Sequence, residues 1–125
     1  MCKALIIDDE DAICRLIIYA LARNDIDADI ATDSSEGITK FEQEDFDVVI
    51  TDMLMPGVDG NGIAQHIRNS AKPATPIIGI SGTSWLIDQH HFNAVFEKPF
   101  PIHLLVDTVK NLTNIPLDTL AVAKS

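Results

Sequence analysis

Short apolar runs that end in charged residues constrain this chain most. Residues 4–7 are apolar and lead into Asp8 and Asp9, and residues 48–51 lead into Asp52. A third apolar run, residues 94–96, comes shortly before Lys98. Short runs of this kind are typical of strands buried in a parallel sheet. Because open parallel sheets place their ligand sites outside the carboxyl ends of the strands, we expect these charged groups to meet at one edge.

The meeting of three carboxylates and one ammonium group favours a metal site. Carboxylates that are crowded together repel one another unless a cation lies among them. We therefore expect a divalent cation at this edge, with Lys98 beside it. Each acid also has a simpler interpretation when it is taken alone. Asp8 and Asp9 could cap the helix that follows, since acids favour helix N-termini, and Asp52 could be an exposed turn residue.

Apolar runs alternate with helical patterns along the whole chain, which predicts βαβ units. Candidate N-caps are Asp11, Ser34 and Asp59. Short loops and right-handed crossovers then give a three-layer α/β sandwich. The expected strands are residues 3–7, 28–31, 47–51, 77–80 and 93–96. The expected helices are residues 11–24, 35–43, 61–70, 83–91 and 102–111, and the segment 83–91 has room for about two turns.

Size and charge narrow the functional classes. A chain of 125 residues fits a single domain, with a core over about residues 3–111 and a short C-terminal tail over 112–125. The net charge of −10 disfavours direct binding to nucleic acid or to an anionic membrane. We expect a cytoplasmic protein for three reasons. The two cysteines do not form the pattern of a disulfide framework, and the sequence contains neither a membrane-spanning stretch nor a secretory signal.

Four motifs follow the predicted strands, and they are residues 8–10, 52–60, 81–82 and 98–100. Taken together, they resemble a response-regulator receiver domain of two-component signalling, similar to the chemotaxis regulators. The resemblance extends from Lys3 to about Asn111. It implies the flavodoxin-like receiver fold, with a five-stranded parallel sheet of order 2-1-3-4-5. The motifs stand in the family's order at the ends of the first, third, fourth and fifth strands.

The resemblance also implies a set of metal ligands. Asp9 and Asp52 would bind Mg²⁺ directly, together with the backbone carbonyl of Leu54. Asp8 would act through a metal-bound water. Mg²⁺ suits such a site because it is a hard cation that prefers oxygen ligands and keeps several waters.

Asp52 would, by the same resemblance, accept a phosphoryl group from a histidine kinase or phosphotransfer protein. Lys98 would pair with the phosphoryl oxygens, and Ser81 would hydrogen-bond the group once it is attached. Pro99 would follow a cis peptide bond. The chain would then be a signalling domain that assists its own phosphorylation and dephosphorylation, not an enzyme. Phosphorylation would switch a surface that binds a protein partner. The sequence leaves open whether the chain also forms a homodimer.

Other functional classes fit the residues less well. A phosphatase of the haloacid-dehalogenase type needs a second acid two residues after its nucleophile, where this chain has Leu54. A flavodoxin-like cofactor binder needs a phosphate-cradling loop after the first strand, where residues 8–10 are acidic and would repel phosphate. An inactive receiver would have no need for the complete charged set. Whether the chain works alone or belongs to a larger regulator or kinase stays open.

Two positions depart from the family pattern. The segment from Gly82 to Glu97 is short for the family, so we expect the fourth helix to be stunted, distorted or absent. Many family members bind partners or dimerise through a face that includes this helix. The family also often has Tyr or Phe three residues before the lysine, where this chain has Val95. We therefore expect the Ser81 part of the switch to be kept and the aromatic part to be lost.

Overall fold

Five parallel strands form one sheet in the order β2-β1-β3-β4-β5, as the sequence predicted. The computed structural model describes residues 2–55, 57–82 and 91–113. Each strand begins and ends within one residue of its predicted bounds. The strands are β1 (Lys3–Ile7), β2 (Asp27–Ala31), β3 (Val48–Asp52), β4 (Ile77–Ser81) and β5 (Ala94–Glu97).

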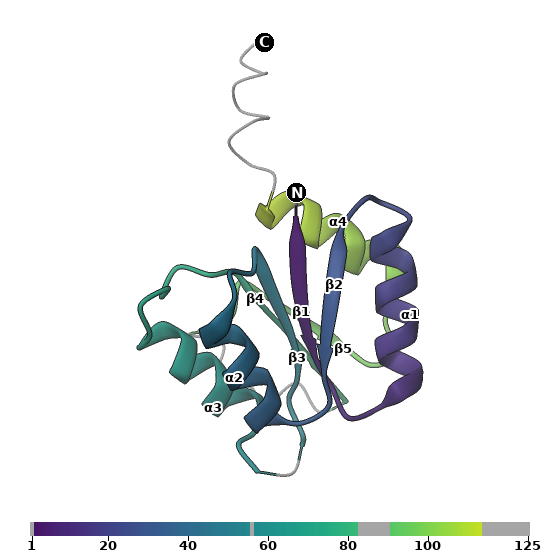
Figure 1. Cartoon of the computed structure of the whole chain (residues 1–125). Helices are drawn as coiled ribbons and strands as arrows, with labels where there is room; N and C mark the ends of the chain where they lie inside the picture. Colours follow the sequence, from purple (N-terminus) through teal and green to yellow (C-terminus); the bar gives the residue numbers. More distant parts are fainter. Residues whose placement is uncertain (1, 56, 83–90, 114–125) are drawn as a thin grey trace, which may run out of the picture.

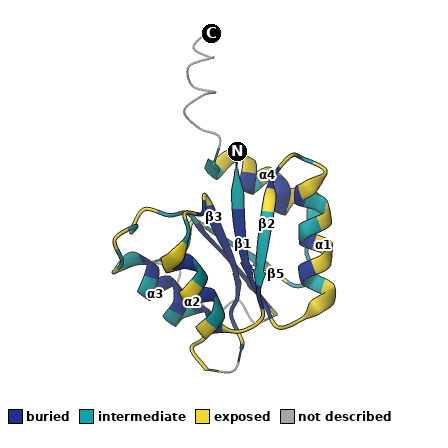
Figure 2. Ribbon diagram, viewed as in Figure 1, coloured by how far each residue is buried: buried dark blue, intermediate teal, exposed yellow. Residues whose placement is uncertain are grey.

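Helices cover both faces of the sheet, which gives the expected three layers (Figure 1). Helices α1 (Asp11–Ala22) and α4 (Ile102–Thr113) pack on one face. Helices α2 (Ser34–Gln43) and α3 (Gly60–Arg68) pack on the other. The two-sided cover explains the continuous apolar runs in the central strands, residues 4–7 of β1 and 48–50 of β3. Figure 2 shows β1 and β3 as largely buried between these helix layers, and every residue of β3 and β4 is buried.

The alternation of side chains along each strand divides the core in two. In β1, Ala4 and Ile6 pack towards α1 and α4, whereas Leu5 and Ile7 pack towards α2 and α3. All four are at most 1% exposed. Burying one large aliphatic side chain stabilises a fold by about 1.5–3 kcal/mol, so both half-cores hold the strand ends firmly in place. The functional groups at those ends therefore have a rigid support.

The helix starts differ from the sequence prediction at two of three N-caps. Asp59 caps α3 as expected, because its Oδ1 accepts a hydrogen bond from the backbone N of Gly62 at 2.9 Å. At α2 the cap is Asp33 and not Ser34. The extended backbone of Asp33 lets its Oδ1 reach the N of Glu36, at 2.8 Å, while Ser34 is already the first helical residue.

At α1 the predicted N-cap, Asp11, is the first helical residue. The N-cap position is taken by Glu10, whose side chain makes no capping hydrogen bond. The side chain of Glu10 instead accepts a hydrogen bond from Lys98. The prediction was wrong because the helix begins at Asp11 itself, and the residue before it has a tertiary partner in place of a capping bond.

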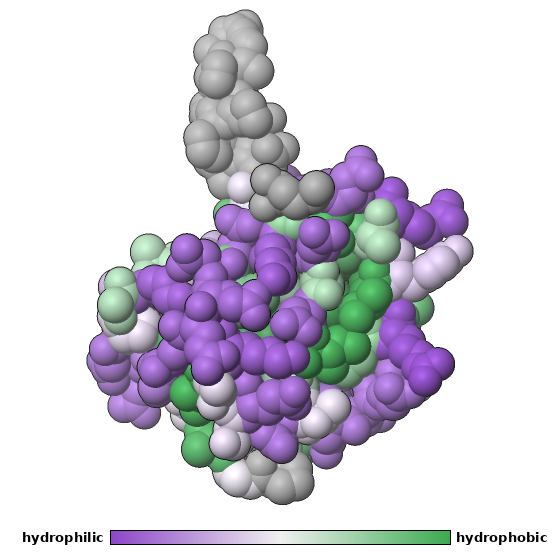
Figure 3. Space-filling view, viewed as in Figure 1, coloured by the Kyte–Doolittle hydropathy of each residue, from purple (hydrophilic) through white to green (hydrophobic). Residues whose placement is uncertain are grey.

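The predicted short helix at residues 83–91 lies almost wholly outside the described residues. The described ranges contain four helices, and α4 corresponds to the last helix that the sequence predicted. None of these helices is long and apolar enough to cross a membrane. The surface over α2 is largely hydrophilic (Figure 3), in keeping with the strong negative charge of the chain.

Candidate functional site

The carboxyl ends of β1, β3 and β5 bring Asp8, Asp52 and Lys98 together. Asp52 is the last residue of β3, and Asp8 directly follows β1. Both are buried, with 6% and 2% of their surface exposed. Nζ of Lys98 lies 3.4 Å from Oδ1 of Asp52 and 4.0 Å from Oδ2 of Asp8. The convergence that the strand ends predicted is therefore present for these three side chains.

Glu10 joins this group, and the sequence analysis did not single it out. Its Oε1 accepts a hydrogen bond from Nζ of Lys98 at 2.7 Å, the shortest of the lysine's contacts with the three carboxylates. Carboxylate oxygens of Asp8, Glu10 and Asp52 all lie within 4.8 Å of one another. Asp9, which was predicted as a ligand, is exposed and is not part of this group.

Glu10 reaches the site through a local turn. The chain bends at Asp9, and the backbone N of Glu10 donates to Oδ1 of Asp8 at 2.8 Å. The first and third residues of the acidic run therefore meet at the site, and the sequence pattern alone does not mark this. Asp9 still acts on the site electrostatically, because its negative charge adds to the effect of burial in raising the pKa of Asp52.

Backbone hydrogen bonds fix the positions of these residues. The N of Asp8 donates to the carbonyl of Ala31, at 3.0 Å, which ties the loop after β1 to the end of β2. The N of Lys98 donates to the carbonyl of Ser81, at 2.8 Å, which ties the loop after β5 to the end of β4. Ser81 is 1% exposed, and it stands in register with Glu97. The peptide bond between Lys98 and Pro99 is cis, as predicted.

Burial sets the protonation behaviour of the site. It raises the pKa of Asp8 from 3.8 to about 6, against the backbone hydrogen bond from Glu10, which lowers it. Burial also raises the pKa of Asp52, and the charge of Lys98 opposes that shift. For Lys98, burial is the largest single influence and lowers the pKa, but the hydrogen bond to Glu10 and the three negative charges together raise it. Lys98 is therefore held in its charged form.

The donor set fits a hard divalent cation. Oδ2 of Asp8 is buried and has no hydrogen-bond partner among the residues that the structure describes. A buried carboxylate oxygen without a partner is costly, and a cation would satisfy it. Oxygen donors are the ligands that Mg²⁺ prefers. Leu54, the predicted carbonyl ligand, lies two residues after Asp52 with its side chain 59% exposed.

Val95 occupies the position, three residues before Lys98, where the family often has Tyr or Phe. Val95 stands in register with Gly79 of the neighbouring strand β4 and is half-buried. A Cβ atom at Gly79 would lie 3.0 Å from two ring atoms of Phe92, so this ring packs directly over the glycine. Sequence reasoning did not identify Phe92, because its contact depends on how the chain enters β5. Phe96, in register with Ile80, packs with the other half of the core.

Comparisons with known proteins agree with this geometry. The family model of the response regulator receiver domain matches residues 4–110. Among curated relatives, the regulatory protein VanRB of Enterococcus faecalis is 29% identical over 117 residues, with 88% of this chain and 51% of the relative covered. The response regulator ArlR of Staphylococcus saprophyticus is 30% identical, with the same coverage of both chains. The chain thus spans about half the length of these relatives.

Solved structures give the same picture. A response regulator receiver domain protein from Clostridium thermocellum is 28% identical, with a TM-score of 0.82 over 91% of this chain and 95% of the other. The response regulator protein TrrA from Thermotoga maritima, solved in complex with Mg²⁺-BeF, is 30% identical. Its TM-score is 0.83, and the match covers 90% of this chain and 99% of that structure.

Proposed function

This chain belongs to the response regulator receiver domain family, and on that premise we propose that Asp52 is its phosphoryl acceptor. One observation carries the proposal. Asp52 is a buried carboxylate at the end of the central strand, and Nζ of Lys98 lies 3.4 Å from its Oδ1. A buried acid beside one fixed ammonium group, with a second buried acid next to it, suits nucleophilic chemistry better than a structural role.

The proposed reaction is transfer of a phosphoryl group from a phosphohistidine. A carboxylate oxygen of Asp52 attacks the phosphorus, a P–O bond forms, and the P–N bond to the donor imidazole breaks with imidazole as the leaving group. The product is an acyl phosphate on Asp52. The donor is a histidine kinase or a phosphotransfer protein, as is usual for two-component systems.

The acidic residues of the site would hold Mg²⁺. Asp8, Asp9 and Asp52, with the Leu54 carbonyl, are the proposed residues of the site. The buried Oδ2 of Asp8, which has no hydrogen-bond partner among the described residues, supports the place of Asp8 in this set. The cation would offset the repulsion between an anionic acceptor and an anionic donor. Glu10 is a further candidate, since its carboxylate lies with those of Asp8 and Asp52.

Lys98 and Ser81 would read out the modification. The backbone N of Lys98 donates to the carbonyl of Ser81, which ties the two residues to each other. New phosphoryl oxygens would attract the ammonium group of Lys98 and the hydroxyl of Ser81, the last residue of β4, which pairs with β3. A local change of charge would thus bias the loops at this edge of the sheet. We propose that those loops alter a surface that binds a protein partner.

Phosphorylation by acetyl phosphate, read by intact mass, tests the proposal. We expect the wild-type chain to gain one phosphoryl group in the presence of Mg²⁺ and none in EDTA. Asp52→Asn should gain none while its circular dichroism stays unchanged. Asp45→Asn is the matched control, because the side chain of Asp45 is 97% exposed and lies outside the carboxylate group. Retained labelling in Asp52→Asn would move the acceptor to another residue.

A further inference from the structure

Ser34 is a buried hydroxyl that its own helix does not use. It is 4% exposed and begins α2, three residues after β2 ends at Ala31. Asp33 already caps this helix, so the hydroxyl of Ser34 is not needed there. Its Oγ accepts a hydrogen bond from the backbone N of Val58, at 3.1 Å, across 24 residues of sequence. Ser34 therefore connects the start of α2 to the segment that follows the proposed acceptor.

Residues 53–55 and 57–59, here called the acceptor loop, are the described part of the segment between Asp52 and the start of α3. The loop is tied at its first residue, where the N of Met53 donates to the carbonyl of Ile80 at 3.0 Å. It is closed at its end, where the N of Gly60 donates to the carbonyl of Met53 at 3.2 Å. The bond from Val58 to Ser34 lies between these two points in the chain and holds the loop from outside.

Gly57 shows how closely the loop is fitted to this hydroxyl. Its φ of +89° is a conformation that favours glycine. A Cβ atom at this position would lie 3.1 Å from Oγ of Ser34, which is tighter than ordinary van der Waals contact. A side chain at position 57 would therefore press on the hydroxyl of Ser34.

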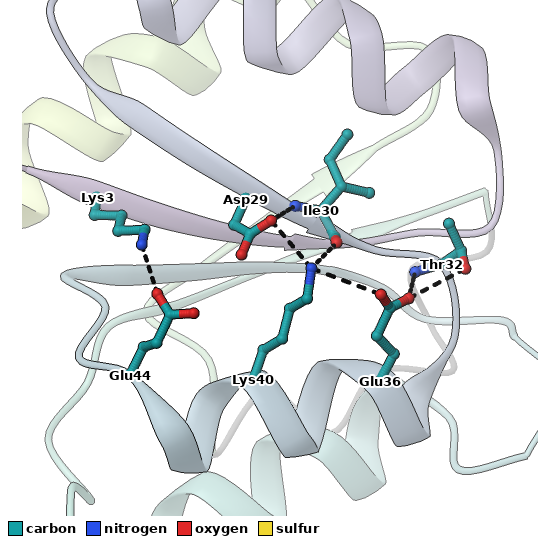
Figure 4. A network of polar contacts seen from close by, with 7 residues as sticks. All are labelled: Lys3, Asp29, Ile30, Thr32, Glu36, Lys40 and Glu44. Atoms are coloured by element: carbon teal, nitrogen blue, oxygen red, sulfur yellow. Dashed lines mark hydrogen bonds and ion pairs between the residues drawn. The ribbon is translucent and has the colours of Figure 1, made fainter.

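The anchor itself is rigid, because α2 is fastened to the sheet (Figure 4). Nζ of Lys40 donates to Oδ1 of Asp29 at 3.0 Å and to the carbonyl of Ile30 at 2.7 Å, both in β2. Oε1 of Glu36 accepts from the backbone N of Thr32 at 2.9 Å. Both side chains belong to the helix that Ser34 begins, so its hydroxyl is presented from a helix that is fastened to the end of β2.

We infer that Ser34 is a positioning residue for the chemistry at Asp52. Through Val58 it holds the acceptor loop, and with it the carbonyl of Leu54, in the arrangement that binds Mg²⁺. The inference rests on the proposed function, which makes that carbonyl a ligand. Loss of the hydroxyl would leave the N–H of Val58 without this acceptor and let the loop adopt other arrangements. Because one neutral hydrogen bond is involved, we expect a loss of about fivefold in Mg²⁺ affinity.

Calorimetric titration of the whole chain with MgCl₂ tests the inference. Three variants are compared with wild type, at two adjacent positions in the first turn of α2. We expect Ser34→Ala to bind Mg²⁺ about fivefold more weakly than wild type and to exchange the amide hydrogen of Val58 faster. Ser34→Thr keeps a hydroxyl and should restore both readouts. Ser35→Ala is the matched control, since Ser35 is exposed on the same helix.

The outcomes separate this inference from the proposed function. If Ser34→Ala lowers the free energy of unfolding in EDTA but leaves the Mg²⁺ dissociation constant unchanged, the hydroxyl is merely structural and the inference is wrong. An equal loss of affinity in Ser35→Ala would also overturn it. If the wild-type chain itself binds no Mg²⁺, the proposed metal site fails first, whatever the variants do.

Discussion

Nζ of Lys98 lies 2.7 Å from Oε1 of Glu10 but 3.4 Å from Oδ1 of Asp52. The lysine that is proposed to meet the phosphoryl group is thus paired more closely with a neighbouring acid than with the acceptor. The side chain of Glu10 is 56% exposed, so this ion pair is well solvated and weak. Phosphorylation would require Lys98 to exchange one partner for another, and Glu10 therefore competes with the phosphoryl group.

Glu10→Gln should accelerate phosphorylation by acetyl phosphate. The change weakens the competing pair and leaves Lys98 free to turn towards Asp52. Because exposed ion pairs contribute at most about 1 kcal/mol, the gain should not exceed about fivefold. Rates from intact mass over time provide the measurement, with Asp11→Asn as the control, since Asp11 pairs with Arg15 instead. Slower labelling together with weaker Mg²⁺ binding would instead make Glu10 a metal ligand.

Lys98→Ala should separate metal binding from phosphoryl transfer. Three carboxylates would remain without their ammonium partner, so Mg²⁺ should bind as tightly as in wild type or more tightly. Phosphorylation should slow by at least about tenfold, because the charge that would stabilise the transferred group is gone. Calorimetry and intact mass measure the two effects. Lys110→Ala, an exposed site on α4, is the control. Loss of Mg²⁺ binding in Lys98→Ala would show that the two roles are not divided in this way.

Asp8→Asn should stabilise the metal-free fold. Burial raises the pKa of Asp8 from 3.8 in the unfolded chain to about 6 in the folded one. A raised carboxyl pKa contributes stability that is complete below about pH 4 and is lost as the pH rises through about 6. At pH 7 the ionised Asp8 thus costs up to about 3 kcal/mol, since each pKa unit corresponds to 1.36 kcal/mol.

The gain from Asn will be smaller than this cost, because a buried amide also needs partners, and we expect about 1–2 kcal/mol at pH 7. The gain should shrink at pH 5, where the wild-type carboxyl is largely protonated. Urea denaturation in EDTA at both pH values measures it, with Asp9→Asn as the exposed neighbouring control. A less stable Asp8→Asn protein at pH 7 would mean that this carboxylate is well satisfied without a metal.

Strand positions could be predicted because they depend on local features. Apolar runs such as residues 48–51 mark buried strands, and the carboxyl-end rule then places Asp8, Asp52 and Lys98 at one edge without further information. The bounds of all five strands follow from this to within one residue. The fold and the main cluster of the site therefore follow from short stretches of sequence that are read one at a time.

What the sequence missed depends on contacts between distant residues. Lys98 pairs with Glu10 across 88 positions, and Ser34 binds Val58 across 24. Neither contact can be predicted from the residues that neighbour either partner in the sequence. Two of these residues lie at helix starts where the caps were mispredicted: the N-caps are Glu10 and Asp33, whereas Asp11 and Ser34 were predicted. A polar side chain beside a helix N-terminus has a local partner available, but here tertiary partners compete for it.

Gly60→Ala should destabilise the fold and disturb the site, because this glycine lies against the backbone of the acceptor. A Cβ atom at Gly60 would come 2.8 Å from the carbonyl O of Asp52 and 2.9 Å from Cα of Met53. Backbone atoms cannot rotate away as a side-chain end can, so the start of α3 or the end of β3 must shift. Overpacking of this kind typically costs about 1–3 kcal/mol.

Gly82→Ala is the matched control for that variant, since a Cβ atom there would have no neighbour within 4 Å. Urea denaturation should show a loss for Gly60→Ala and little change for Gly82→Ala. Mg²⁺ titration should show weaker binding for Gly60→Ala only, because its clash pushes on the carbonyl end of Asp52 itself. Equal stability and equal Mg²⁺ affinity in the two variants would mean that the junction of β3 and α3 adapts freely, and that the rigidity of this strand end does not position the acceptor.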